Sequence, residues 1–158
     1  MKNEFMQSNS FHLLQDEAMR KNACQAVDHF LKDQKPVKNA QLYAIPLVIQ
    51  AKGLSGLRDL IDNQKSKNTK KENKKFWLFL SDLILSNPGP EFSLRKFLLD
   101  QPQIKALLQD ETSAIEKKEQ KKIRKANKVF VNEIVEYVLP VYFEHFNCHY
   151  FYRTRQGA

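Results

Sequence analysis

Glycine and cysteine are scarce in this chain of 158 residues, which contains four glycines and two cysteines. Two cysteines cannot form a disulfide framework, so Cys24 and Cys148 are interpreted as reduced thiols of a cytoplasmic protein. No apolar run approaches the roughly 20 residues that a membrane-spanning helix needs. Residues 1–16 also lack the charged, apolar and small-residue order of a secretory signal peptide. These absences predict a cytoplasmic protein with no membrane partner.

The recognisable signatures of enzymes are also missing from the sequence. There is no glycine-rich phosphate-binding loop, no zinc-protease helix motif and no nucleophile elbow. His145, Cys148 and His149 lie close together, but no second pair of ligands completes a tetrahedral zinc site. The acidic pair Asp110-Glu111 lies at an expected helix start, where carboxylates favour the positive end of the helix dipole. We therefore predict a protein without catalytic activity, metal or other cofactor.

Helical spacing of apolar residues recurs along the chain, whereas strand-like alternation never persists beyond a few residues. The low glycine content and the 11 phenylalanines favour helices packed on aromatic and aliphatic side chains. The sequence thus predicts an all-α protein, a compact bundle of about five to seven helices with a long C-terminal helix, in a single domain. Three segments are expected outside the main helices. They are an N-terminal arm that need not be ordered (residues 1–12), a basic loop (residues 64–75) and a C-terminal tail (residues 147–158).

The longest predicted helix runs from about residue 113 to about residue 146. With successive residues placed about 100° apart, one face is apolar and carries Ile123, Ala126, Phe130, Ile134, Tyr137 and Val141. The opposite face is basic, and its candidate contacts with RNA are Lys121, Arg124, Lys125 and Lys128. Such a stripe can follow a phosphate backbone, although a single run of lysines is more often only a solvated face.

A second apolar stripe lies beside the first on the same helix. Its members are Val131, Val135, Val138, Leu139, Tyr142 and Phe146. One core face does not need both stripes, so the second predicts a surface that binds another protein. The alternative function is therefore a stand-alone α-helical interaction module, an adaptor or inhibitor that packs on a larger partner.

Residues 64–75 contain six lysines and a single acid, Glu72. Alone, such a segment is a flexible polar loop. Next to a basic helix it would also hold an RNA or DNA backbone without reading its sequence. The candidate contacts here are Lys67, Lys70, Lys71 and Lys74. Trp77 could stack on a base, although a tryptophan at helical spacing beside phenylalanines is more often part of the core.

Residues 42–60 combine a nearly all-apolar helix with an immediate second helix. Pro46 removes one backbone donor and clashes with the carbonyl four residues earlier, which predicts a kink. Gly53 follows the last residue of the apolar helix and is free to adopt the positive φ that closes a helix C terminus. Leu54, Leu57 and Ile61 then resume helical spacing.

This segment resembles the small subunit of type III-B (Cmr) CRISPR effector complexes. In that family a helix ends in the pattern Leu-Pro-x-x-Ile-x-x-x-Gly-Leu, and here the matching residues run from Ile45-Pro46 through Ile49 to Gly53-Leu54. The next family elements are an amphipathic helix, a variable loop with lysines and an aromatic-rich helix. Residues 54–63, 64–75 and 76–86 are similar to them in that order.

The resemblance implies a non-catalytic small subunit of a type III CRISPR RNA-guided effector complex. Its partners would be guide RNA, target RNA, copies of itself and the other subunits of the complex. Its basic face would line the groove that holds the RNA, and Lys52 and Arg58, which flank the matched segment, are added as contacts. The chain departs from the family in its arm before Asp16, its proline-bounded residues 87–110 and its longer last helix.

Overall fold

The computed structural model describes residues 2–67, 70–86 and 89–156, and all regular structure in these ranges is helical. The predicted all-α class and long C-terminal helix are thus confirmed. The α-helices are α1 (Lys2–Met6), α2 (Asn9–Leu13), α3 (Met19–Asp33), α4 (Asn39–Lys67), α5 (Lys71–Leu80), α6 (Leu94–Leu99), α7 (Pro102–Lys105) and α8 (Lys117–Gln156). Two π-helical turns, Leu14–Ala18 and Ser81–Leu85, precede α3 and follow α5, and a 3-10 turn, Glu111–Ser113, precedes α8.

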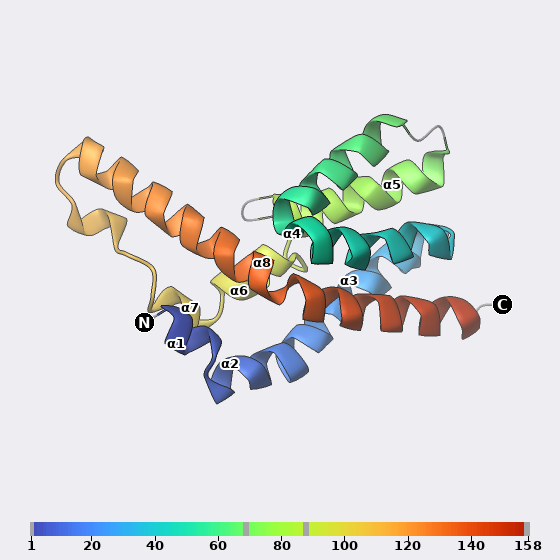
Figure 1. Cartoon of the computed structure of the whole chain (residues 1–158), viewed down its shortest axis with the longest axis horizontal. Coiled ribbons are helices and arrows are strands. Elements are labelled where there is room, and N and C mark those ends of the chain that lie inside the picture. The colour runs from blue at the N-terminus through green and yellow to red at the C-terminus, as the bar shows by residue number, and fades with distance from the viewer. Residues whose placement is uncertain (1, 68–69, 87–88, 157–158) are drawn as a thin grey trace.

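α8 is the longest helix and the one on which α3 and α4 both pack. Its C-terminal half packs against α3 and the first part of α4, whereas its N-terminal half extends beyond the other helices with residues 106–116 beside it (Figure 1). The buried side chains of α8 accordingly begin at Val131 and continue to Tyr150. Before Val131, no described residue of α8 is buried. One half of this helix thus builds the core, and the other half is left for solvent or a partner.

The apolar face predicted for α8 is wrong, because most of its residues do not point into the core. Of its six members only Ile134 is buried, and Tyr137 is 43% exposed. Every residue of the second stripe, from Val131 to Phe146, is instead buried in the core. Because α3 and α4 both pack on this half of α8, the helix needs a wider apolar face than one partner would demand. The second stripe is therefore not a surface for another protein.

α4 is a helix in two limbs that meet at Gly53 (Figure 1). Gly53 has φ 61° and ψ −146°, which confirms the predicted positive φ. The ψ angle is extended rather than left-handed helical, so the glycine forms an elbow between two limbs instead of a closing turn. The helix continues through Pro46 with helical φ and ψ, and the break lies at the glycine alone.

The three segments expected outside the helices are largely helical. The arm contains α1 and most of α2, and its Phe11 is 1% exposed with its ring 4.9 Å from that of Phe5. The basic loop is shorter than predicted, because residues 64–67 complete α4 and residues 71–75 begin α5. Residues 68–69, which lie between these helices, are outside the described residues.

The predicted C-terminal tail continues α8 as far as Gln156, and residues 157–158 lie outside the described part of the chain. Tyr150 explains this continuation. Its side chain is fully buried, and its hydroxyl accepts a hydrogen bond of 2.8 Å from the backbone N–H of Val37. The end of α8 is thereby fixed to the connection between α3 and α4, because burial of apolar aromatic area offsets the entropy lost on ordering the chain.

Tyr142 and Tyr150 form a matched pair for a stability measurement. Both are fully buried, but the Tyr142 hydroxyl has no hydrogen-bond partner among the described residues. Tyr142→Phe should therefore leave the free energy of unfolding unchanged or raise it by about 1 kcal/mol. Tyr150→Phe should lower it by roughly 1–3 kcal/mol, because the Val37 N–H loses its acceptor. Urea unfolding followed by circular dichroism measures both, and equal losses in the two variants would contradict the prediction.

Candidate nucleic-acid interface

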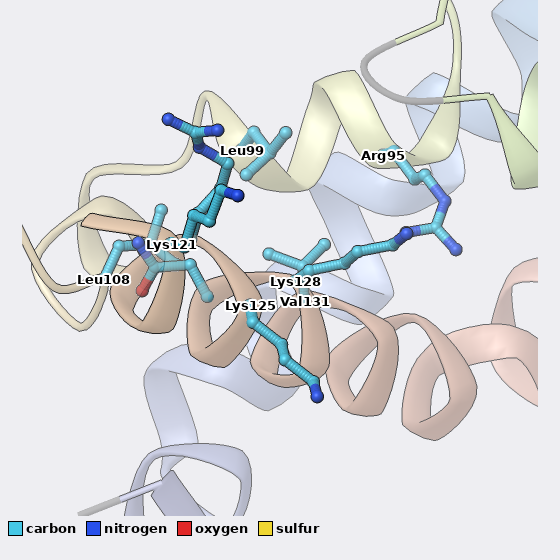
Figure 2. A pocket seen from close by; sticks show the side chains of 9 residues that line it. Arg95, Leu99, Leu108, Lys121, Lys125, Lys128 and Val131 are labelled. Atoms are coloured by element: carbon cyan, nitrogen blue, oxygen red, sulfur yellow. The ribbon is translucent and has the colours of Figure 1, made fainter. Parts of the chain in front are cut away.

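The predicted basic face of α8 lies beside a pocket of ≈ 430 Å³ between α6 and α8, which we call the α6–α8 pocket (Figure 2). α8 contributes four cationic side chains to it, and α6 contributes one arginine. The lining residues are Arg95, Leu99, Leu108, Lys121, Arg124, Lys125, Asn127, Lys128 and Val131. The four cations of α8 are those selected from the sequence, so the structure places all of them at one concave surface.

Residues 106–116 are held along α8 by side-chain amides. The backbone N–H of Gln109 donates to Asn127 Oδ1, and Asn127 Nδ2 donates back to the Gln109 carbonyl, each at 2.9 Å. Nearer the N terminus of α8, Gln120 Nε2 donates to the Ala114 carbonyl, also at 2.9 Å. These bonds fix residues 106–116, which we call the strap, to the projecting half of α8. Leu108, at the start of the strap, then forms one wall of the pocket.

Arg124 is already engaged within the protein. Its Nε donates to Glu111 Oε1 at 3.1 Å, and Nη2 donates to the same oxygen. This hydrogen-bonded ion pair lowers the pKa of Glu111 and raises the pKa of Arg124. Both side chains are solvent-exposed, so the pair contributes little to stability. A phosphate at Arg124 would have to compete with Glu111 or share the guanidinium with it.

Arg95 was missed by the sequence reasoning, yet it is the most enclosed cation of the pocket. It is 3% exposed, and its Nε donates to the backbone carbonyl of Ile84. Burial, together with the charge of Arg58, lowers the pKa of Arg95. The sequence did contain a signal: Lys96 has Asp100 as its i+4 ion-pair partner, whereas the i+3 and i+4 neighbours of Arg95 are leucines.

Arg58 does not line this pocket, although its charge acts on Arg95. It lies on the second limb of α4 and is exposed, and its charge acts on Arg95 across the boundary between α4 and α6. Lys52 is elsewhere, since it lines a hollow inside the α4 elbow together with Leu47 and Gly56. Arg58 thus acts on Arg95 without lining the pocket, and Lys52 lies apart from both.

The lysines of the predicted basic loop form a separate basic surface. Lys67, Lys70, Lys71 and Lys74 are all exposed, at the end of α4 and the start of α5. This turn lies at the opposite end of the molecule from the projecting half of α8 (Figure 1). The ten predicted contacts therefore do not make one patch, and among them only the four of α8 line the α6–α8 pocket.

The other candidates of the sequence have structural partners. Trp77 is fully buried and its Nε1 donates to Gln41 Oε1 at 3.0 Å, which confirms the core interpretation. His145 Nε2 lies 3.1 Å from the Gln15 carbonyl, and His149 Nε2 lies 2.8 Å from Asp28 Oδ1. Within the described ranges, no three histidine, cysteine or acidic side chains gather in a way that could hold a metal ion.

None of the described helices combines the length and apolar character needed to cross a membrane. Comparison with known proteins adds no relative. The chain matches no family model, no curated protein and no solved structure.

Proposed function

We propose that this protein is a non-catalytic small subunit of a type III CRISPR RNA-guided effector complex. It binds the backbone of the guide RNA–target RNA duplex through its basic helix faces and stacks with copies of itself and with other subunits. The proposal includes a cytoplasmic location and no cofactor. The observation that carries RNA binding is that Lys121, Lys125 and Lys128 of α8 line the α6–α8 pocket together with Arg95 of α6.

Charge balance supports a polyanionic partner. The chain carries a formal net charge of +8, and the projecting half of α8 concentrates lysines on exposed positions. Of the four candidate cations on α8, only Arg124 forms an ion pair among the described residues. A phosphate backbone would release counterions on meeting the others, and this release is the main source of affinity in binding that does not read sequence.

The assignment to an effector complex rests on the resemblance of residues 42–86. Its central glycine has the positive φ expected there, and the two limbs of α4 reproduce the expected succession of helices. Contact with neighbouring subunits needs exposed apolar side chains, and Tyr43 and Leu47 of α4 are 57% and 67% exposed. The stand-alone interaction module loses its main support, because the stripe that suggested it is buried.

Salt dependence tests RNA binding directly. The affinity for unrelated RNA strands should be similar, and it should fall steeply between roughly 50 and 200 mM salt because counterions are released on binding. Fluorescence anisotropy with two labelled RNAs of different sequence and one duplex measures this. Affinity that is insensitive to salt, or restricted to one sequence, would contradict the proposal.

Sequencing of co-purified RNA tests the CRISPR assignment separately. The protein, purified from its native cells, should carry repeat-derived guide RNAs together with the other effector subunits. RNA without such guides would contradict the effector-complex assignment while leaving general RNA binding intact.

A further inference from the structure

Arg95 is a buried cation without a counter-charge. It forms no ion pair within the described ranges, and its one hydrogen bond is from Nε to the Ile84 carbonyl. A guanidinium has five N–H donors, and the Nη groups of Arg95 are not among the buried polar atoms that lack a partner, so they remain open to solvent. Taking most of a charged side chain out of water without a counter-charge is costly, and the surrounding charges add to that cost.

Those surrounding charges are cationic. Arg58 lowers the pKa of Arg95, and the Lys128 side chain extends toward the Arg95 guanidinium in Figure 2. Lys121 lines the same pocket, whereas Lys125 points away from Arg95 in Figure 2. Cations that face one another across a cavity repel, and an anion between them would turn this repulsion into attraction. The geometry therefore favours an anion between Arg95 and Lys128.

The pocket wall is otherwise mostly apolar, apart from Asn127 and Arg124. Leu99, Leu108 and Val131 form its walls between α6, the strap and α8. A volume of ≈ 430 Å³ lies within the usual range of about 300–1,000 Å³ for small-molecule sites. An inorganic anion would fill only a small part of this space and would leave the apolar walls unused. A ligand with a phosphate at one end and a flat, weakly polar group at the other matches both parts.

We propose that the α6–α8 pocket binds one nucleotide, with its phosphate between Arg95 and Lys128 and its base against Leu99, Leu108 and Val131. The choice of a nucleotide rests on the proposed RNA-binding function. The pocket adds a requirement that the exposed lysines do not impose, because a base can enter only if it is unstacked. The bound nucleotide therefore belongs to a single strand or a strand end, or is a free mononucleotide, and not to the interior of a duplex.

Calorimetry and thermal unfolding of the full chain test the pocket. The ligands are AMP, UMP, ribose 5-phosphate, inorganic phosphate and adenosine. AMP and UMP should bind more tightly than ribose 5-phosphate or inorganic phosphate, and adenosine should bind most weakly because it lacks the charge. Lys128→Gln should weaken AMP binding by about tenfold, since one charge-assisted contact is lost. Lys122→Gln, an exposed change on α8 outside the pocket, should leave it unchanged.

Arg95→Met should abolish AMP binding, and Lys128→Gln carries the test if the arginine variant does not fold. Equal affinity for AMP and inorganic phosphate, equal effects of the two lysine variants, or binding of an acidic peptide without any nucleotide would each overturn the proposal. Displacement of AMP by single-stranded RNA but not by duplex identifies a strand as the source, and failure of both to displace it identifies a free nucleotide. Loss of salt-dependent RNA binding with AMP binding intact contradicts only the proposed function.

Discussion

Replacing Gly53 with valine is expected to lower the free energy of unfolding by roughly 3 kcal/mol or more. A positive φ with an extended ψ is almost restricted to glycine, so any side chain strains the backbone there. A β-carbon at this position would also lie 2.6 Å from Oε1 of Glu136 on α8. The Glu136 carboxylate ends a flexible, exposed side chain that can rotate away, so the backbone strain accounts for most of the expected loss.

Urea unfolding measures this loss, and two further variants separate its causes. Ala51→Val places the same side chain on an exposed, ordinary helical position of α4 and should cost at most about 0.7 kcal/mol. Glu136→Ala in the Gly53→Val background should restore only the part of the loss that comes from the steric contact. A Gly53→Val protein that unfolds at the wild-type urea concentration would refute the role of the elbow.

Changing Lys121, Lys125 and Lys128 together to glutamate is expected to weaken RNA binding by about 100-fold or more. All three are exposed on the projecting half of α8, so the change places three negative charges where the backbone would bind. The salt dependence should also become shallower, by about 2 units in the log–log slope for a single strand. Arg124 is kept, because glutamate there would face Glu111 and disturb the strap for a reason unrelated to RNA.

The matched control is glutamate at three exposed lysines elsewhere, Lys21, Lys38 and Lys105. Both triple variants change the net charge equally, and exposed substitutions usually shift stability by only about 0.5 kcal/mol each. Gel shift with RNA compares their binding, and circular dichroism checks that both remain helical. If the two variants bind RNA equally, net charge alone explains the affinity and the α8 surface has no special role.

Local patterns in the sequence were sufficient for part of the fold. Helical spacing without strand alternation predicted the all-α class, and the position of Gly53 between two helices predicted its positive φ. The inward face of α8 could not be derived in this way, because it depends on two other helices packing on the same half. The continuation of α8 into the C-terminal segment could not be derived either, since it depends on the hydrogen bond between Tyr150 and Val37, which are 113 positions apart in the sequence.

Part of the candidate site could likewise be predicted from local patterns, and part of it depends on the fold. The cations of α8 share a helix, so their common face follows from the 3.6-residue period alone. Arg95 joins them only because α6 approaches α8 in space. The sequence reasoning treated the loop lysines and the α8 lysines as neighbours, whereas the fold separates them (Figure 1).

The uneven burial of α8 predicts two levels of local stability along one helix. The part from Val131 to Tyr150 is buried in the core, so its backbone amides are expected to exchange with solvent only when the whole protein unfolds. The part before Val131 is held by a few hydrogen bonds to the strap, chiefly those of Asn127, and solvent can compete for each of them. Because α8 is one continuous helix, the buried part sets the direction in which the projecting lysines lie, and loss of these bonds would release residues 106–116 while the lysines stay in place.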